Sequence, residues 1–522
     1  MINGYKDLLV WQKAYELCLD IYKATQKYPR FELSVILSIA SGLMLALSFP
    51  LFNFNFLIWF ALLPLLFAVQ NKNLFRSFTL GIVAGFIMFI FQIFWLNIFH
   101  LLVPLILSLY LSLYFGVFCV LYNLLTREFP ELEIIIIPLV WTALELIRSI
   151  GGWGFPAGLL SYSQYNHLFL IQISDIIGVF GLSFIIAFVN ASIFIAFKQK
   201  SFNKSIKIIT SLVIIFLVLI SYGFLKIGEN RKDANNLRIA LIQPNLDFDA
   251  YDKSKAINIL AQLTYKASQA NPDIIIWPET SFKESIRLDM ELSQDIYSIV
   301  KKSKTYLLLG SSDFKEQNFK FKRFNSAFLL SSYGEVLGQY NKIHPVLFWE
   351  TFPIRYYLPF LKNTESKGRC DKGNDPKLFN MPKGNFSVLI CFEGIFSDLS
   401  RKFVKNGAQF LVNITNDSWS KSSAEHYQHA SMDVFRAIEN RVYYIRVGNS
   451  GVTEVIDPYG KIVSSLPLYT KGYLIANISK NDEKTFYNRY GDLIASFSVF
   501  TVGIMIFFCL LKKGVKKLIK RR

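Results

Sequence analysis

The chain has 522 residues, of which 52% are hydrophobic and 16% aromatic, and its formal net charge is +18. It is too long and too apolar for a single water-soluble domain. The first half contains long stretches with almost no charge, whereas residues from about 230 to 490 have an ordinary globular composition, so the sequence predicts a membrane protein with a substantial soluble part.

Residues 1–31 differ from everything that follows. In this stretch Trp11, Ala14, Tyr15, Cys18 and Ile21 would share one side of an amphipathic helix. The stretch lacks the uninterrupted apolar core of a signal peptide. It resembles the first helix of the small four-helix-bundle proteins encoded in intervening sequences of bacterial ribosomal RNA genes. We interpret it as a fused or misplaced fragment, with an interfacial helix as the alternative.

Eight later segments are candidates for membrane-spanning helices, and most approach the ~20 residues that a bilayer requires. They are Leu33–Leu51, Phe54–Val69, Phe78–Phe99, Leu101–Leu125, Ile134–Ile150, Phe169–Phe197, Ile206–Ile227 and Ile494–Leu511. The second is short, and the fifth carries Glu145 and Arg148. These two charges are about one helical turn apart, which favours mutual neutralisation over a site for a lipid headgroup.

The basic residues of the short loops predict the orientation. Lys and Arg occur in QNKNLFRS, TREFPELE and KQKSFNKSIK, whereas the loops at Pro50–Asn53, His100 and Gly151–His167 contain neither. Alternate loops are therefore expected in the cytoplasm. With eight spans the basic tail LKKGVKKLIKRR joins them, so residues from about 228 to 490 would lie outside the cytoplasm. The positive charge is then a topological signal that needs no nucleic-acid partner, although it is compatible with anionic lipid.

The soluble part alternates β-rich runs with helical patterns, which is typical of a layered α/β domain. The predicted strands are LRIALIQ, DIIIWPE, TYLLLGSS, NSAFLLSS, FSVLICFE, AQFLVNITND, GVTEVIDPYG and GYLIANIS. Helical patterns cover Lys253–Ser268, Leu292–Lys302 and Ala424–Ile438. Polar residues at the ends of such strands are the first candidates for a functional site.

Three strand ends carry chemically useful side chains. Glu279 ends IIIWPE, Lys342 and Glu350 lie in YNKIHPVLFWE, and Cys391 and Glu393 lie in VLICFEG. Alone, each has an ordinary explanation: a helix cap, a solvated lysine, or a cysteine that acts as a small buried hydrophobe. Together, in the order Glu, Lys, Cys within one α/β domain, they resemble the nitrilase superfamily.

The whole chain from about Glu32 onward resembles the bacterial apolipoprotein N-acyltransferases. The motifs that carry this resemblance are GFP and YSQ at Gly154–Gln164, IQPN, WPET, NKIHPV, CFEG, VNITNDSW, YQHASMDVFRAIEN and GNSG. The resemblance implies about eight transmembrane helices and an α-β-β-α sandwich domain outside the cytoplasm. It divides the chain into an extension (1–31), a transmembrane domain of about seven helices (32–228), a nitrilase-like catalytic domain (229–490), and a final helix with a basic cytoplasmic tail (491–522).

The three residue types also fit one reaction. A thiol of pKa ~8.5 is mostly protonated at neutral pH, so Cys391 needs help to act as a nucleophile. The ammonium of Lys342 would favour the thiolate and stabilise an oxyanion. Glu279 would be the general base, and acyl transfer through a thioester would be ping-pong. By resemblance, Glu350 and Glu393 orient Lys342 and the cysteine loop.

The resemblance also implies the substrates and the setting. The donor would be a glycerophospholipid and the acceptor the α-amino group of the diacylglyceryl-modified first cysteine of an apolipoprotein, in the last step of bacterial lipoprotein maturation. The enzyme would be a multi-pass protein of the bacterial inner membrane with its catalytic domain on the periplasmic side. We expect neither a cofactor nor a metal.

The sequence departs from the family at several positions. HPVLFWE replaces a segment close to His-Leu-Val-Pro-Phe-Gly-Glu, with Pro345 displaced and Trp349 where glycine is expected. Phe392 follows the nucleophile where tyrosine is common, and NDSWS replaces the usual ending Trp-Phe-Gly. A tryptophan often found after the first strand is missing, and Tyr251 is the nearest aromatic candidate. These changes affect loop geometry and substrate preference rather than the three central residues.

Other sites are weaker candidates. A structural disulfide between Cys370 and Cys391 is an alternative in an oxidising compartment, but it would block the nucleophile. Cys370 follows no strand and is the poorer nucleophile. His426 and His429 lack further ligands at a metal-site spacing, so hydrogen-bonding roles are favoured. GGWGFPAG follows no strand and is interpreted as a turn, not as a phosphate-binding loop.

Two other functions stay open at the level of sequence. A membrane-anchored nitrilase-type amidase would use the same three residues on soluble amides, with water as the second substrate. A membrane scaffold with an inactive site is the second alternative, which the altered segment near Glu350 and the N-terminal extension support. Lipoprotein N-acylation by the chain in cells that lack any other source would exclude the scaffold.

Overall fold

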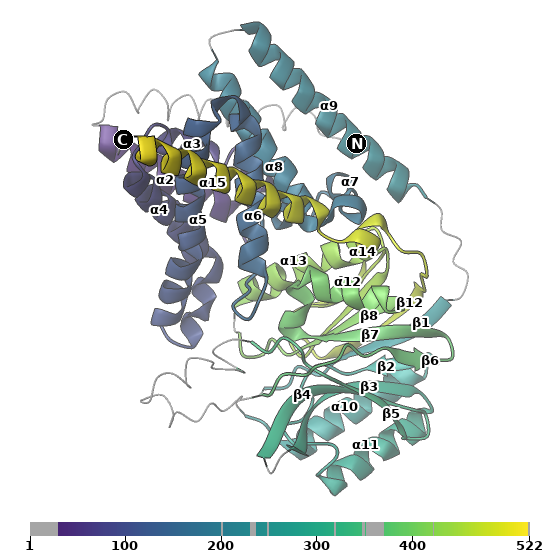
Figure 1. The fold of residues 1–522 in the computed structure, drawn as a ribbon. Helices are drawn as coiled ribbons and strands as arrows, with labels where there is room; N and C mark the ends of the chain where they lie inside the picture. The colour runs from purple at the N-terminus through teal and green to yellow at the C-terminus, as the bar shows by residue number, and fades with distance from the viewer. Residues whose placement is uncertain are drawn as a thin grey trace.

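The computed structural model describes residues 30–199, 202–229, 236–247, 250–317, 320–346, 350, 370–420 and 422–519. The predicted amphipathic extension lies outside them except for its last two residues, which begin the first membrane-domain helix. Trp349 also lies outside the described residues. Within them the chain forms a helical half and an α/β half, with the α/β half beneath the helices in Figure 1.

The helical half consists of α-helices joined by short 3-10 turns. Its elements are α2 (Arg30–Leu47), η1 (Asn55–Trp59), α3 (Leu63–Val69), α4 (Leu74–Ile93), η2 (Phe94–Ile98), α5 (Leu102–Glu128), η3 (Pro130–Leu132), α6 (Glu133–Ser149), η4 (Leu160–Gln164), α7 (Leu168–Ile171), α8 (Ser174–Lys198), α9 (Phe202–Ile227) and the C-terminal α15 (Leu493–Ile519). By length and composition, five helical stretches suffice to cross a membrane: Leu74–Ile98, Leu102–Glu128, Ser174–Lys198, Ser205–Ile227 and Leu493–Lys512.

Four of the eight predicted spans are interrupted or short. The first forms an apolar helix only over Glu32–Leu47. The second is divided into η1 and α3, where Pro64 stands in the first turn of α3 and favours a new helix start. The fifth is the 17-residue α6. The sixth is divided between α7 and α8, and α8 itself breaks at Gly178. The membrane character is thus confirmed, while the number eight stays a prediction.

The α/β half contains two six-stranded sheets. Their strands are β1 (Asn236–Gln243), β2 (Ile274–Ile276), β3 (Tyr306–Gln317), β4 (Lys320–Leu330), β5 (Val336–Asn341), β6 (Phe379–Met381), β7 (Gly384–Ile390), β8 (Phe410–Thr415), β9 (Tyr443–Gly448), β10 (Thr453–Ile456), β11 (Ile462–Leu466) and β12 (Gly472–Ser479). The sheet orders are β12-β1-β2-β3-β4-β5 and β11-β10-β9-β8-β7-β6. In each sheet the three central strands are parallel.

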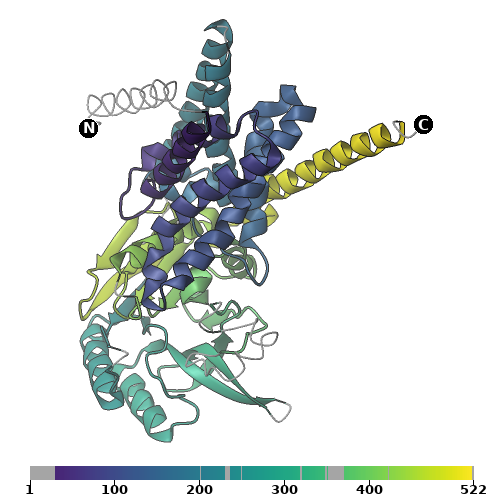
Figure 2. The same cartoon turned by 90° about the vertical axis from the view of Figure 1, so that its left-hand side faces the viewer.

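Helices cover the outer face of each sheet, which gives the predicted α-β-β-α sandwich (Figure 1). They are α10 (Lys253–Ser268) and α11 (Met290–Ser303) on the first sheet, and α12 (Ser397–Lys405) and α13 (Ser423–Asn440) on the second. The short α14 (Phe486–Tyr490) leads into α15. Figure 2 shows α10 and α11 at the end remote from the membrane helices. The layer α12–α13 therefore separates the second sheet from the helical half, and α13 packs directly on α8.

Candidate active site

Glu279 lies just beyond β2, where the chain leaves the first sheet. The neighbouring strand β3 approaches closely because Gly310 has no side chain: a Cβ there would lie 2.6 Å from the Glu279 Cα. The carboxylate is buried. It accepts hydrogen bonds from the Asn325 amide (2.6 Å) and from the Asn416 backbone N–H (2.8 Å). Glu279 is thereby fixed between the two sheets.

Lys342 follows β5 and is only 1% exposed. Its Nζ lies 3.4 Å from Glu279 Oε1 and 2.9 Å from Glu350 Oε2. Glu350 also accepts hydrogen bonds from Asn325 Nδ2 (3.0 Å) and from the Val346 N–H (2.7 Å). The ammonium thus lies between two carboxylates, which share the Asn325 amide as a donor and each accept from one further backbone N–H.

Cys391 is the first residue of the 3-10 turn η7 (Cys391–Ile395) that follows β7. Its φ of 54° is uncommon for a residue other than glycine and turns the chain sharply off the strand. The Asn413 amide donates to the Cys391 carbonyl (3.2 Å), and the same side chain leaves no room for a Cβ at Gly394. The cysteine therefore has a backbone position that neighbouring residues determine.

Glu393 joins the cysteine turn to the lysine loop. Its carboxylate accepts from the N–H groups of Ile343 (2.6 Å), His344 (2.9 Å) and Ile390 (2.9 Å). The Tyr340 hydroxyl lies 2.9 Å from both of its oxygens. Because these donors come from both sides of the site, Glu393 fixes the distance between the Lys342 loop and the Cys391 turn.

Burial and neighbouring charges determine the protonation states of Cys391, Glu279 and Lys342. Burial, reinforced by Glu279, raises the pKa of the Cys391 thiol well above its ordinary value, and Lys342 lowers it by less. Burial also raises the pKa of Glu279, although Lys342 opposes the shift. Burial disfavours the charged form of Lys342, but Glu350 and Glu279 outweigh it and hold the lysine pKa well above normal. Lys342 is therefore charged, and the resting cysteine is a thiol rather than the thiolate that the lysine alone would favour.

Glu350 is the more acidic of the two carboxyls. Burial raises its pKa, but Lys342 and the Val346 N–H overcome this effect, and the net shift is downward. Glu350 therefore carries the negative charge that balances Lys342. Glu279, with its raised pKa, is left free to exchange a proton.

The remaining predicted residues lie in different surroundings. The Phe392 ring packs against Phe155 of the helical half at 6.2 Å and against Phe396 at 5.4 Å, between ring centroids. The residue that replaces the family tyrosine thus makes apolar contacts towards the membrane domain. The Tyr251 hydroxyl donates to Glu284 (2.5 Å).

Cys370 and Cys391 are both free thiols. Burial raises the pKa of Cys370 to about 12. Its backbone N–H donates to the Glu350 carbonyl (2.9 Å), so the polar loop in which it lies returns to the lysine site. The structure thus has no Cys370–Cys391 disulfide, and both of these described cysteines lie in the same half of the molecule.

Sequence reasoning missed several residues that organise the site. Asn325 joins Glu279 to Glu350, and Tyr340, Asn413 and Asn416 hold the surrounding loops. The signal for Asn325 was available: an amide stands between Phe324 and the run SAFLL, in a strand that is otherwise mostly apolar from there on. A buried amide in a central strand needs partners, which here are two carboxylates.

His426 and His429 belong to a buried cluster of charged side chains that includes the carboxylates of Asp417 and Glu425. Ligand atoms of Asp417, Glu425 and His429 lie within 4.8 Å of one another. However, Arg446 Nη2 lies 3.0 Å from both Asp417 Oδ2 and His429 Nδ1. This guanidinium already supplies the positive charge that a metal ion would bring, so the donor set does not fit a metal. His426 Nε2 lies 3.0 Å from the Tyr469 hydroxyl, in keeping with a hydrogen-bonding role.

Glu145 and Arg148 of α6 are both buried but are held separately. Glu145 accepts from Trp141 Nε1 and from the Leu160 N–H, each at 3.0 Å. Arg148 donates to the carbonyls of Phe155 (2.7 Å) and Ala157 (2.6 Å). No ion pair joins the two among the described residues. Their charges nevertheless interact electrostatically, so mutual neutralisation stays a prediction, and each side chain also holds the loop that follows α6.

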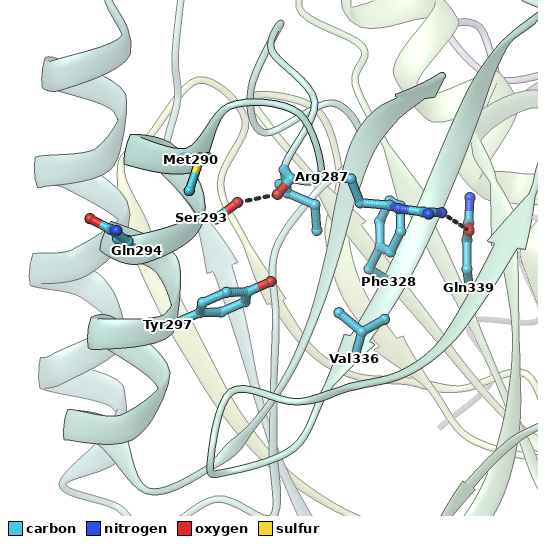
Figure 3. A pocket seen from close by; sticks show the side chains of 9 residues that line it. Arg287, Met290, Ser293, Gln294, Tyr297, Phe328, Val336 and Gln339 are labelled. Atoms are coloured by element: carbon cyan, nitrogen blue, oxygen red, sulfur yellow. Dashed lines mark hydrogen bonds between the residues drawn. The ribbon is translucent and has the colours of Figure 1, made fainter. Parts of the chain in front are cut away.

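A groove with a volume of about 520 Å³ lies between α11 and strands β4 and β5, away from this site (Figure 3). Its lining includes Arg287, Met290, Tyr297 and Gln339. Figure 3 shows Arg287 directed at Gln339, and the two side chains are 3.4 Å apart. None of the predicted site residues lines this groove.

Comparisons with known proteins cover both halves of the chain. Residues 41–192 match the apolipoprotein N-acyltransferase N-terminal domain, and residues 238–486 match the carbon-nitrogen hydrolase family. The apolipoprotein N-acyltransferase of Geobacter metallireducens is 36% identical over 482 residues, which cover 88% of this chain and 92% of that protein. Apolipoprotein N-acyltransferase 1 of Treponema denticola is 31% identical, over 94% of this chain and 99% of that protein. An amidase from Nesterenkonia sp. of known structure aligns at 17% identity and a TM-score of 0.40, over 52% of this chain and 99% of its own.

Proposed function

The chain belongs to the apolipoprotein N-acyltransferase family, and from this premise we propose that it moves an acyl chain from a glycerophospholipid to the α-amino group of a diacylglyceryl-cysteine at the N-terminus of an apolipoprotein. As a family member it is a membrane acyltransferase that acts in lipoprotein maturation. The observation that carries the finer proposal is the buried Lys342, which is held by two carboxylates and interacts electrostatically with the buried Cys391.

In the first half-reaction, the Cys391 sulfur attacks the ester carbonyl of the phospholipid. Its proton passes to Glu279, whose raised pKa makes it a better proton acceptor than an ordinary glutamate. Lys342 stabilises the oxyanion of the tetrahedral intermediate. The carbon–oxygen bond breaks, the lysophospholipid oxygen takes the proton back from Glu279, and a thioester remains.

In the second half-reaction, the neutral α-amine attacks the thioester. Glu279 removes the proton from the attacking nitrogen, Lys342 again holds the oxyanion, and the carbon–sulfur bond breaks. The proton on Glu279 returns to the departing sulfur, which restores the thiol. Because the donor leaves before the acceptor reacts, the kinetics would be ping-pong. Glu350 and Glu393 would position the lysine and the cysteine turn without touching substrate.

We further propose the bacterial inner membrane as the location, with the catalytic domain of residues 229–490 on the periplasmic side between the transmembrane domain (32–228) and the C-terminal helix and tail (491–522). The distribution of basic loops supports this orientation. Apolar side chains exposed on α9 and α15, such as Leu217, Leu225, Phe500 and Leu510, support a lipid environment for those helices.

The experiment uses the purified full chain in detergent with a phospholipid that carries a labelled acyl chain. Digestion and mass spectrometry should find a hydroxylamine-sensitive acyl group on the Cys391 peptide and none in the Cys391→Ser variant. Addition of a synthetic diacylglyceryl lipopeptide should then remove the label from the enzyme and place it on the peptide amine. An N-acetylated lipopeptide is the matched control that cannot accept it.

The alternatives predict different results. An amidase would release free acid from soluble amides and leave the lipopeptide unmodified. A scaffold would bind phospholipid and form no thioester. Either outcome, obtained with folded protein, would contradict the proposed function.

A further inference from the structure

The membrane helix α8 is broken near its start. Gly178 has φ 65° and ψ 179°, a conformation that only glycine adopts readily. A Cβ at this position would also lie 2.5 Å from Tyr487 Cε2 of α14. The break is therefore built into the contact between α8 and the α/β half. It leaves the Val179 N–H at the start of the continuing helix without a helical partner.

The α/β half supplies that partner. Glu439 of α13 accepts a hydrogen bond from the Val179 N–H at 3.0 Å. A carboxylate at a helix N-terminus satisfies the free donor and interacts favourably with the helix dipole. The cap thus comes from a helix that lies more than two hundred residues further along the chain.

The other side of Glu439 leads to the cysteine turn. Its Oε2 accepts from Arg436 Nε at 2.8 Å. Arg436 Nη1 in turn donates to the carbonyl of Ile395 (3.1 Å), the last residue of the turn that begins with Cys391, and to the Tyr162 hydroxyl of the helical half (3.2 Å). Two side chains therefore connect the broken membrane helix to the turn that carries the nucleophile.

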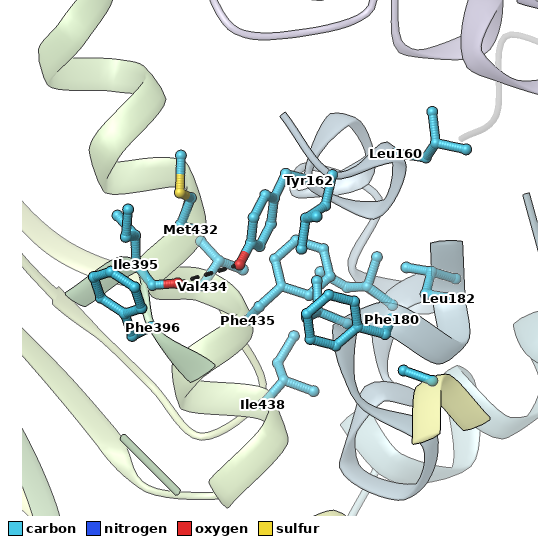
Figure 4. Packing of buried hydrophobic residues seen from close by; sticks show 14 of the residues in the cluster. Leu160, Tyr162, Phe180, Leu182, Ile395, Phe396, Met432, Val434, Phe435 and Ile438 are labelled. Carbon is cyan, nitrogen blue, oxygen red and sulfur yellow. Dashed lines mark hydrogen bonds between the residues drawn. The ribbon is translucent and has the colours of Figure 1, made fainter. Parts of the chain in front are cut away.

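The connection lies in a dry environment. Figure 4 shows Phe435 and Ile438 of α13 packed among Phe180, Leu182 and Leu160 of the helical half, next to the Tyr162 hydroxyl and Ile395. Arg436 and Glu439 are themselves fully buried. In such surroundings water cannot replace a lost hydrogen bond, so the pair has a single well-defined geometry.

We propose that Glu439 is a positioning residue that sets the depth of the Cys391 turn relative to the membrane helices. This inference rests on the proposed function, because depth matters only when the acyl donor is held in the membrane. Loss of the connection should slow acylation by a bilayer phospholipid and spare the reaction of Cys391 with a small water-soluble reagent. A purely structural role would change both reactions together.

The test compares two reactions of the full chain in lipid nanodiscs. One is thioester formation from labelled phospholipid. The other is alkylation of Cys391 by iodoacetamide, in which the sulfur–carbon bond forms, iodide leaves and the thiol proton is lost. For Glu439→Gln we expect phospholipid acylation to fall by about 10-fold or more, since small misplacements of reacting groups have effects of this size. The alkylation rate should not change.

Asp175→Asn is the matched control. Asp175 Oδ2 also joins the start of α8 to an arginine of the α/β half, Arg441 Nη2, at 2.8 Å, but among the described residues its hydrogen bonds go to Tyr222 and Arg441 and not to the cysteine turn. This variant should keep the wild-type ratio of the two rates. Tyr162→Phe removes only the hydroxyl that Arg436 contacts and serves if Glu439→Gln fails to fold; it should lower the acylation rate alone, by a smaller factor.

Three results would overturn the inference: equal slowing of both reactions, no slowing of either, or the same change of ratio in Asp175→Asn. Failure of the proposed function gives a different result. In that case the wild-type protein itself forms no thioester, while its alkylation proceeds.

Discussion

Buried polar groups are numerous in both halves of the molecule, but they bind different partners. In the helical half, side chains mainly hold backbone: Arg148 binds the carbonyls of Phe155 and Ala157, and Asn190 binds the Ile58 carbonyl and the Leu62 N–H. These partners are uncharged and do not titrate. Such bonds fix the course of the loops and satisfy backbone N–H and C=O groups, which membrane lipid cannot hydrogen-bond.

In the α/β half, buried charges face one another. Lys342 lies between Glu279 and Glu350, and Arg446 lies between Asp417 and Asp433. The free energy of such groups changes whenever a proton moves, which is what acid–base chemistry requires. The comparison teaches that the same burial supports stability in one half and reactivity in the other. Substitutions should therefore affect stability alone in the first half, and reaction rate or the pH dependence of stability as well in the second.

The largest effect on rate is expected for Glu279→Gln. Gln keeps the size of the side chain but cannot accept a proton, so thioester formation should fall by about 10²–10⁴-fold. Removal of a buried carboxyl of raised pKa stabilises the fold, but the amide nitrogen of Gln cannot accept as one of the two carboxylate oxygens does, so the melting temperature in detergent should change little. Quench-flow with labelled phospholipid measures the rate. Glu335→Gln, the same change at an exposed position, is the control, and a loss below 10-fold would remove Glu279 from the chemistry.

Glu393→Gln should combine both kinds of effect. The amide nitrogen of Gln cannot accept from Ile343, His344 and Ile390 together, so at least one N–H loses its partner. We expect a loss of stability of about 2–3 kcal/mol and a slower acylation. Tyr340→Phe removes one donor and leaves the carboxylate, so it should have the smaller effect on both measurements. Wild-type kinetics in Glu393→Gln would show that the Lys342 loop and the Cys391 turn do not need Glu393 to hold them in place.

The strand ends explain why the sequence could indicate three residues that the structure brings near one another. Glu279, Lys342 and Cys391 each follow an apolar run, and a strand end in an α/β fold is where reactive side chains collect. The partners within strands and helices were not predictable in this way. In the sequence, Glu439 cannot be distinguished from an ordinary charged residue of a helix. Its contacts form only when α8 packs against α13, so no local sequence pattern predicts them.

The same reasoning applies to the fold. The predicted helix over Lys253–Ser268 coincides with α10 because its apolar residues repeat at helical spacing. Strand β9 was missed since the buried Arg446 interrupts its apolar run, and β5 was missed because an exposed edge strand has a weak alternating pattern. The break at Gly178 was hidden in a continuous hydrophobic segment, where only contacts with Tyr487 and Glu439 reveal it.

In the helical half, Asn190→Ala should lower stability and leave chemistry intact. The change leaves the Ile58 carbonyl and the Leu62 N–H without partners inside a dry helix bundle, at a cost of about 2–4 kcal/mol. Thermal unfolding in detergent measures the loss. The alkylation rate of Cys391 in the folded fraction should match the wild type. Asn203→Ala, on the exposed surface of α9, is the control and should change neither quantity.

The last prediction concerns the pH dependence of stability and tests whether buried charge in the α/β half influences stability away from the reacting groups. Burial, reinforced by Asp433, raises the pKa of Glu454 to about 8. The folded protein therefore keeps this proton to higher pH than the unfolded chain, whose glutamates titrate near ~4.3. The stabilising contribution is complete below that value and is lost as pH rises through about 8.

Stability should thus fall with pH by at most about 1.4 kcal/mol per pH unit from this group. Glu454→Gln should flatten the fall between roughly pH 5 and 8, as measured by thermal unfolding across that range. Glu335→Gln, exposed to solvent, should leave the slope as it is in the wild type. If Glu454→Gln also leaves the slope unchanged, Glu454 is already ionised in the folded protein, and Arg446 must then balance Glu454 in addition to Asp417, Asp433 and Glu425.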